Sequence, residues 1–183
     1  MWVVIDGLDG TGKDTVIEKL KEQYPDWIYV KDPSPLVASE IRQVLLDKEL
    51  SDITRLYLYL AARVELLHKE ILPALKAGNT VICNRYSFST YAYQGSVIDQ
   101  NLIHQASDAG CLEDYQPDKT ILLLGDRFAD GDNVMDDFCD DKRESITENF
   151  LELAQQHNNV HVVWVNRKSK EEVYREVVQL LDK

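Results

Sequence analysis

The stretch Gly7-Leu8-Asp9-Gly10-Thr11-Gly12-Lys13 decides the fold of this chain. It matches the pattern G-x-x-x-x-G-K, follows an apolar run at residues 2–5, and precedes a helical pattern that starts at Lys13. Glycines let backbone amides curl around phosphate oxygens, and the start of the next helix adds a favourable dipole. Lys13 would reach the outer phosphates. The stretch therefore predicts a loop that binds nucleotide phosphates, in preference to a simple glycine-rich turn.

The residue after this lysine departs from the pattern. Ser or Thr is expected there as a ligand of Mg²⁺, but the chain has Asp14, with Thr15 behind it. A carboxylate also binds Mg²⁺, although it brings negative charge close to a triphosphate. We therefore predict Asp14 as a Mg²⁺ ligand. The residues predicted to bind the nucleotide here are Gly7, Gly10, Thr11, Gly12, Lys13, Asp14 and Thr15.

Short β-rich runs alternate with helical patterns along the whole chain. The predicted strands are residues 2–5, 27–31, 80–83, 119–124 and 160–165. The predicted helices are residues 13–24, 36–46, a long one from 51 or 52 to about 71, 87–94, 100–109, one that ends near 157, and one after Ser169 that ends at 181. We expect Pro73 to kink or restart the long helix before Gly78 ends it. This alternation predicts an α/β fold with a parallel sheet covered by helices on both faces.

Ligands of such sheets bind beyond the carboxyl ends of the strands. The loops at these ends are residues 6–12, 32–35, 84–89, those from 125 onward, and 166–169. We therefore look for the functional residues in these five places.

Length and composition limit the possible functions. The chain has 183 residues, 44% of them hydrophobic, which suits one domain over residues 1–183. A formal charge of −12 disfavours binding to nucleic-acid polymers and to anionic membranes. No apolar run is long enough to span a membrane. Three widely spaced cysteines without a CxxC pair predict a reduced cytoplasmic protein without a zinc site.

The negative charge is concentrated in one segment. Residues 126–148 contain nine acidic and three basic side chains, which is half of the excess of the whole chain. Charge runs of this kind are usually solvated loops. The position of the segment, after the fourth predicted strand, also places it at the edge of the sheet where ligands bind.

Two further strings narrow the function. Tyr59-Leu60-Ala61-Ala62-Arg63 lies on the predicted long helix, and Asn84-Arg85-Tyr86-Ser87-Phe88-Ser89-Thr90-Tyr91-Ala92-Tyr93-Gln94-Gly95 follows the third strand. Together with the phosphate loop, and in this order, they resemble the thymidylate kinase family over residues 1–124. The likeness weakens past Gly125 and returns faintly at residues 150–154 and in the last strand and helix.

The resemblance implies a P-loop kinase fold with five parallel strands in three layers. It implies phosphorylation of dTMP to dTDP, with ATP as phosphoryl donor and Mg²⁺ as cofactor. It also implies a lid, expected here at about residues 126–143. Members of the family are often dimers packed through the long helix, so it implies a homodimer. The candidates for that contact are Tyr57, Leu60, Val64 and Leu67.

Carried over position by position, the resemblance assigns a base-binding and sugar-binding site. Tyr59 stands where an aromatic, usually Phe, stacks on thymine. Arg63 stands where an arginine donates to the thymine O4, and such a donor rejects cytosine, which presents an amino group there. The other residues matched to the base and sugar are Ser89, Thr90, Tyr93 and Gln94.

The resemblance also assigns the groups around the phosphates. Asp9 matches the acid that accepts from the 3′-hydroxyl, and Arg85 and Arg42 match arginines that bind the monophosphate. Asp32 and Pro33 match an acid–proline loop after the second strand, in which the acid here is one methylene shorter than the usual Glu.

Two further features depart from the family pattern. Asn84 replaces the Asp of an Asp-Arg pair, so we hypothesise that Asp14 takes over the lost metal-ligand charge. The phosphate loop contains no arginine, and related enzymes then supply arginines from the lid, where Arg127 is our candidate. The predicted catalytic residues are Lys13, Arg85, Asp9 and Arg127, and Asn166 and Arg167 complete the predicted ATP site.

Two alternatives to a dTMP kinase stay open. Tyr59 in place of Phe is compatible with a deoxynucleoside monophosphate kinase of altered or broader base specificity. A P-loop protein that only switches between nucleotide states is less favoured, because it would leave the Arg63 and Asn84–Gly95 strings unexplained. A guanine-reading Asn/Thr-Lys-x-Asp motif is also absent from the chain.

Overall fold

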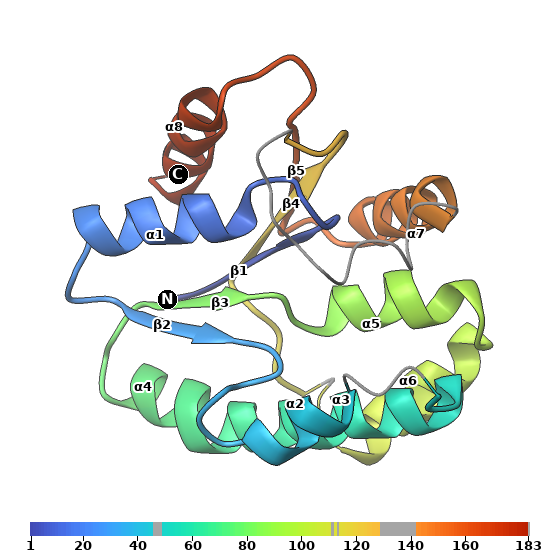
Figure 1. Cartoon of the computed structure of the whole chain (residues 1–183). Helices are drawn as coiled ribbons and strands as arrows, with labels where there is room; N and C mark the ends of the chain where they lie inside the picture. Colours follow the sequence, from blue (N-terminus) through green and yellow to red (C-terminus); the bar gives the residue numbers. More distant parts are fainter. Residues whose placement is uncertain (46–48, 111, 113, 129–141, 183) are drawn as a thin grey trace.

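The computed structural model describes residues 1–45, 49–110, 112, 114–128 and 142–182. Its centre is one sheet of parallel strands in the order β2-β3-β1-β4-β5 (Figure 1). The strands are β1 (Trp2–Gly7), β2 (Ile28–Lys31), β3 (Val81–Asn84), β4 (Lys119–Leu124) and β5 (Val160–Trp164). The prediction of five parallel strands is confirmed, with bounds that differ by at most two residues.

Helices cover both faces of the sheet, as predicted. They are α1 (Lys13–Gln23), α2 (Ser39–Leu45), α3 (Asp52–Leu66), α4 (Leu72–Lys76), α5 (Ser87–Tyr93), α6 (Gln100–Ala109), α7 (Arg143–Gln156) and α8 (Lys170–Leu181). Figure 1 shows α1 and α8 on one side of the strands and α3 to α6 on the other. None of the described helices is both long enough and apolar enough to cross a membrane.

Alternate residues of the strands supply two separate cores. Val3, Ile5 and Ile82 pack with apolar side chains of α1 and α8. Val4 and Cys83 point to the opposite face and pack with α3, α5, α6 and α7. Because both faces are buried, the strands are apolar throughout, and this is the pattern by which the sequence identifies them.

The start of α2 differs from the prediction. A helix over residues 36–46 was expected, but α2 begins at Ser39, and Leu36 lies in a turn with 79% of its surface exposed. The Ser34 hydroxyl accepts hydrogen bonds from the amides of Leu36 and Val37 at 3.1 and 3.3 Å. This side-chain turn competes with helical bonds and delays the helix. Val44, expected on the apolar side of this helix, is 47% exposed.

A π-helical turn interrupts the long helix before Pro73. Ser51 caps α3, which ends at Leu66, and a π-helical turn (Leu67–Ile71) joins it to α4. Pro73 lies in the first turn of α4, where a residue without an amide proton costs no hydrogen bond. The expected restart is therefore observed, and the wide turn before it accommodates the proline.

The end of β1 approaches the backbone of β4 unusually closely. Gly7 has φ +125°, and a Cβ atom built on it would lie 2.1 Å from the Leu123 carbonyl oxygen. The next amide, of Leu8, donates to the same oxygen at 3.2 Å. Only glycine fits this position, which sets where the phosphate loop leaves the sheet.

We expect Gly7→Ala to destabilise the protein by on the order of 3 kcal/mol, because the new methyl group meets a backbone atom that cannot move aside. Gly78→Ala is the matched control: Gly78 also has a positive φ, of +84°, but no atom within 4 Å of its Cβ position. Strain alone should then cost about 1 kcal/mol. Urea unfolding of both variants gives the comparison. Equal losses would contradict the steric explanation.

Candidate active site

The phosphate loop presents unpaired backbone amides. Gly10 and Gly12 have φ of 77° and 84°, a conformation that glycine adopts without steric cost. Among the residues that the structure describes, the amides of Gly10, Thr11 and Gly12 donate to no other group of the chain. Successive free amides at the start of a helix form a concave site for an anion. The predicted phosphate-binding loop therefore has the polarity that its function requires.

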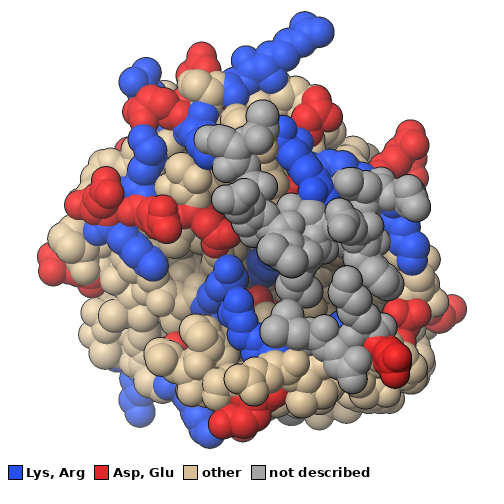
Figure 2. All heavy atoms as spheres, viewed as in Figure 1, with Lys and Arg blue, Asp and Glu red and all other residues tan. Residues whose placement is uncertain are grey.

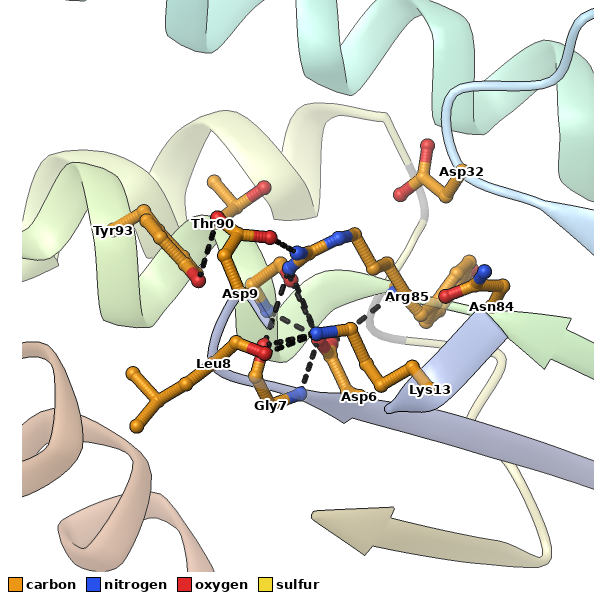
Figure 3. Close-up of polar contacts among 12 residues, drawn as sticks. Asp6, Gly7, Leu8, Asp9, Lys13, Asp32, Asn84, Arg85, Thr90 and Tyr93 are labelled. Carbon is orange, nitrogen blue, oxygen red and sulfur yellow. Dashed lines mark hydrogen bonds and ion pairs between the residues drawn. The ribbon is translucent and has the colours of Figure 1, made fainter. Parts of the chain in front are cut away.

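The carbonyl groups of the same loop are paired. Lys13 donates through Nζ to the carbonyl of Gly7 at 3.1 Å and to that of Leu8. Thr11 donates through its hydroxyl to the Leu8 carbonyl at 2.8 Å, and Arg85 donates to the Gly7 carbonyl at 3.2 Å. The loop thus turns its acceptors toward the protein and leaves its donors for a ligand (Figure 3).

Lys13 is buried beneath this loop, with 6% of its surface exposed. Burial, with the nearby charge of Arg85, lowers the pKa of Lys13 to about 7, although Asp9, Asp6 and Asp14 act in the opposite direction. The lysine is therefore close to losing its charge at neutral pH when no phosphate is near it. A bound phosphate would favour the charged form.

Asp6, at the end of β1, is a fully buried carboxylate that fixes the loop after β3. Its Oδ1 accepts from the Gly7 amide at 2.8 Å and the Ser89 hydroxyl at 2.6 Å. Its Oδ2 accepts from the amides of Tyr86 and Ser89 at 3.2 and 3.0 Å. Arg85, directly before Tyr86, has a positive φ of 66°, a conformation that these bonds hold in place.

Arg85 and Asp9 form the centre of the site (Figure 3). The Arg85 guanidinium donates to Asp9, and to the Ser89 hydroxyl at 3.0 Å. The Tyr93 hydroxyl donates to the other oxygen of Asp9 at 3.2 Å, and the Tyr93 ring lies 5.5 Å from the guanidinium carbon. Burial alone would raise the pKa of Asp9, but Arg85, Lys13 and Tyr93 outweigh it and lower this pKa, so the carboxylate is charged.

A second buried ion pair lies beside it. Arg63, on α3, donates from Nε to Asp32 at 2.6 Å and from Nη2 to the Thr90 hydroxyl at 2.8 Å. Arg63 and Asp32 are both 2% exposed at their side chains. The guanidinium also lies over the Tyr86 ring, 5.2 Å from its centre. These contacts fix the orientation of Arg63, and burial raises the pKa of Asp32 while Arg63 opposes that rise.

Asp14 and Asn84 are neighbours, as the hypothesis of a relocated charge requires. The Asn84 amide donates to the Asp14 carboxylate at 2.7 Å, and Lys31 Nζ lies 3.4 Å from the same oxygen. Burial raises the pKa of Asp14, but Lys31 and the Asn84 amide outweigh it and hold the pKa below its ordinary value. Asn84 also has a buried Oδ1 without a hydrogen-bond partner.

These oxygens fit a Mg²⁺ ion that shares its ligands with a nucleotide. The described residues contain no group of three or more His, Cys, Asp or Glu side chains able to hold a metal by themselves. Mg²⁺ is commonly held by one or two protein oxygens together with phosphates and water. The charged Asp14 carboxylate and the unpaired Asn84 oxygen match that requirement.

The segment after β4 lies against the phosphate loop. Phe128 donates its amide to the Gly10 carbonyl at 3.0 Å. The Arg127 side chain crosses Gly10 so closely that a Cβ atom there would lie 2.7 Å from Arg127 Cγ. Arg127 thus lies beside the phosphate loop, and its role as the lid arginine stays a prediction. Most of the predicted lid, residues 129–141, lies outside the described residues.

Other predicted residues are less closely joined to this centre. Asn166 pairs through its side-chain amide with Asp126, at 2.9 and 3.0 Å, and Arg167 follows it with a positive φ of 60°. Arg42, in the last turn of α2, makes no ion pair with a described residue. Four predicted residues make no side-chain hydrogen bond to the described centre: Thr15 in the first turn of α1, Pro33 after β2, Tyr59 in the middle of α3, and Gln94 directly after α5.

Asp6 and Arg143 were assigned no role by the sequence analysis. A charged residue at the end of an apolar strand was a usable signal for Asp6, because a buried carboxylate must find hydrogen-bond donors. Arg143 begins α7, and its guanidinium donates to the carbonyls of Asp9 and Gly125 at 3.0 and 2.6 Å. No local pattern predicts this long-range contact.

The surface view shows how charge is distributed on this face of the molecule. Figure 2 shows Lys and Arg side chains gathered around a hollow near the middle of the face, with Asp and Glu side chains to one side. This is the kind of local charge separation that a protein of net charge −12 needs in order to bind a nucleotide.

Comparison with known proteins gives consistent matches over the whole chain. Residues 5–177 match the family model described as thymidylate kinase. The thymidylate kinase of Neorickettsia sennetsu is 33% identical over 93% of this chain and 91% of its own length. That of Mycoplasma genitalium is 31% identical over 99% and 93%. The crystal structure of thymidylate kinase from Ehrlichia chaffeensis matches with a TM-score of 0.78 and 26% identity, covering 100% of this chain and 98% of that chain.

The buried Lys13 predicts how the stability of the ligand-free protein depends on pH. Its folded pKa of about 7 lies below the ordinary 10.5, so the unfolded chain binds more protons between these values. The stability contributed by Lys13 therefore rises with pH through this window. Relative to Lys13→Met, the wild type should gain about 1–2 kcal/mol of unfolding free energy between pH 7 and 9.

Urea unfolding at the two pH values measures this gain. The variant keeps the loop carbonyls paired, since Thr11 and Arg85 still donate to them. Lys76→Met, at an exposed position of α4, removes the same charge and is the matched control. If the difference in unfolding free energy between wild type and Lys13→Met is the same at both pH values, the pKa of Lys13 is not lowered toward 7 in the folded protein.

Proposed function

Because the chain belongs to the thymidylate kinase family, we propose that it brings ATP and dTMP together across the Lys13, Asp9 and Arg85 centre. The activity of the chain is that of its family, phosphorylation of the thymidine monophosphate. One observation supports this centre most directly: a row of unpaired loop amides lies beside a buried Arg85–Asp9 pair. Such an arrangement suits two anions that must meet.

The loop residues 7–13 are proposed to hold the ATP phosphates. The amides of Gly10, Thr11 and Gly12 donate to phosphate oxygens, and Lys13 turns from the loop carbonyls to the outer phosphates. Arg127, which lies over Gly10, neutralises the charge of the moving phosphoryl group. Asn166 and Arg167, at the neighbouring end of β5, are proposed to border the base of ATP.

Arg85 is proposed to hold the phosphate of the acceptor. Its guanidinium is already fixed by Asp9, Ser89 and the Gly7 carbonyl. The side chain therefore loses little conformational freedom when the monophosphate binds. Arg42 is proposed as the second arginine. No general base is needed, since the acceptor is an anionic nucleophile and the protein contributes position and charge.

The base and sugar are proposed to bind beside Arg63. The guanidinium is buried and fixed by Asp32 and Thr90, so its donors meet the thymine O4 at a defined place. Tyr59, on the same helix as Arg63, is proposed to stack on the base. The other members of this pocket are Pro33, Ser89, Tyr93 and Gln94, with Tyr93 under the sugar and Asp9 accepting from the 3′-hydroxyl.

Mg²⁺ is proposed to bind at Asp14 with help from Asn84. When bound, the ion supplies positive charge between the outer phosphates of ATP. Lys31 would then move away from the Asp14 carboxylate, or bind it together with the ion. The supporting observations are the charged Asp14 carboxylate and the unpaired oxygen of Asn84.

The arrangement of the chain beyond the site is also a proposal. We propose one P-loop kinase domain over residues 1–183, with an atypical lid within 126–143, and a homodimer in the cytoplasm. Leu60 and Leu67 are 6% and 0% exposed in the chain's own core, so they are withdrawn as dimer residues. Tyr57 is 54% exposed and Val64 is partly buried, and only these two candidates stay.

A coupled assay of ATP consumption with dTMP, dUMP, dCMP, dGMP and dAMP tests the assignment. We expect dTMP to have the highest kcat/KM, because a fixed arginine donor beside the base rejects an amino group. Comparable turnover of several substrates would favour a kinase of broader base specificity. Turnover of none would overturn the kinase assignment. Lys13→Met, purified in parallel, shows whether a contaminating enzyme contributes.

The relocated metal ligand gives a second test. Asp14→Ser should raise the Mg²⁺ concentration for half-maximal turnover by about tenfold or more. The double variant Asp14→Ser with Asn84→Asp restores the usual pair of residues and should recover the lost affinity. Mn²⁺ binding to the ATP complex, followed by electron paramagnetic resonance, gives a readout independent of turnover. Glu18→Ser, an exposed acid on the same helix, is the charge control. Unchanged metal affinity in Asp14→Ser would contradict this role.

A further inference from the structure

Two carbonyl groups in the middle of the phosphate loop accept hydrogen bonds from residues that follow β4. The Gly10 carbonyl accepts from the Phe128 amide, and the Asp9 carbonyl accepts from Arg143 Nη1, each at 3.0 Å. The preceding two carbonyls, of Gly7 and Leu8, accept from Lys13. Arg85 also donates to the first and Thr11 to the second. Arg143 is therefore the only described side chain beyond residue 128 that bonds to the loop backbone.

The bond to Asp9 determines where the next amide points. A carbonyl group and the following N–H belong to one planar trans peptide and point in opposite directions. Holding the Asp9 carbonyl on the Arg143 side thus turns the Gly10 amide the other way. That amide is one of the unpaired donors of the phosphate site. Glycine at position 10 would otherwise let this peptide rotate easily.

The other arm of Arg143 is fixed to the sheet. Its Nη2 donates to the Gly125 carbonyl at 2.6 Å, directly after the end of β4. A Cβ atom at Gly125 would lie 1.8 Å from the Asn166 side-chain oxygen, so this position is closely packed. The planar guanidinium therefore spans from a fixed point of the sheet to the phosphate loop.

We propose that Arg143 is a positioning residue for ATP, which aims the Gly10 amide at the phosphates by holding the Asp9 carbonyl. It acts through the loop backbone and not by contact with the transferred group. The inference rests on the proposed function, in that ATP is taken as the ligand of this loop. The Asp9 carboxylate also orients Arg85. Asp9 therefore connects the proposed ATP side of the site, through its carbonyl, with the proposed dTMP side, through its side chain.

Binding of ATP and of inorganic tripolyphosphate, measured by calorimetry on the full chain without acceptor, tests this role. Arg143→Ala should weaken both ligands by about tenfold, the loss expected when one charge-assisted hydrogen bond ceases to orient a donor. Affinity for dTMP should not change. Arg143→Lys should behave like the alanine variant, because an ammonium group cannot bridge two carbonyls as a planar fork does.

Lys142→Ala is the matched control, since Lys142 is exposed, adjacent, and carries the same charge. If it weakens ATP as much as Arg143→Ala, or if Arg143→Lys binds like the wild type, charge alone matters and the positioning role is overturned. A lower thermal midpoint for Arg143→Ala with unchanged ATP affinity also overturns it, because Arg143 then serves only α7. A loss of kcat at unchanged ATP affinity indicates that Arg143 contacts the transferred phosphoryl group directly. That result also overturns the positioning role.

These outcomes are separable from failure of the proposed function. A wild-type chain that binds neither ATP nor tripolyphosphate contradicts the assignment of the loop itself. A wild-type chain that phosphorylates dTMP, with Arg143→Ala and Lys142→Ala equal in ATP affinity, contradicts only the role of Arg143.

Discussion

Asp6 places a carboxyl group at a position with no solvent exposure, where β1 ends and the phosphate loop begins. A buried carboxylate is tolerated only if its oxygens are satisfied, and Asp6 accepts from two elements, the Gly7 amide and the loop at Tyr86 and Ser89. This need for donors joins the ends of β1 and β3. The left-handed conformation of Arg85, and with it the direction of its side chain, follows from the same bonds.

The phosphate loop shows how the remaining polarity is arranged. Its carbonyls face Lys13, Thr11, Arg85, Phe128 and Arg143, and its free amides face away from them. The arrangement lowers the stability of the ligand-free protein, because burial and the charge of Arg85 disfavour the charged form of Lys13. Proteins commonly accept such local instability at functional sites. A ligand that brings negative charge relieves it.

The sequence predicted those parts of the molecule that local patterns determine. Apolar runs identified the strands. Ser169 was predicted to cap the last helix, and it forms a capping box with Glu172. The rule that ligands bind beyond the carboxyl ends of parallel strands grouped Asp9, Lys13 and Arg85, and the structure places them together. The start of α2 was wrong because the Ser34 hydroxyl competes with helix formation in a way that periodicity does not register. Arg143 was not identified because its partners are 134 and 18 residues away in the chain. Arg42 stays a prediction, since no described contact joins it to the centre.

The ion pairs of the site have a consequence for how an acidic protein selects its ligands. Arg85 is paired with Asp9 and Asp6, and Arg63 with Asp32, so much of the positive charge gathered at the site is balanced by carboxylates at short range. Attraction of a nucleotide then depends largely on fixed charges and dipoles at short range. Mobile salt screens such short, buried interactions far less than it screens the long-range field that draws polyanions to basic surfaces. We therefore expect nucleotide capture to change little with ionic strength, and the surrounding acidic surface to go on repelling nucleic acids.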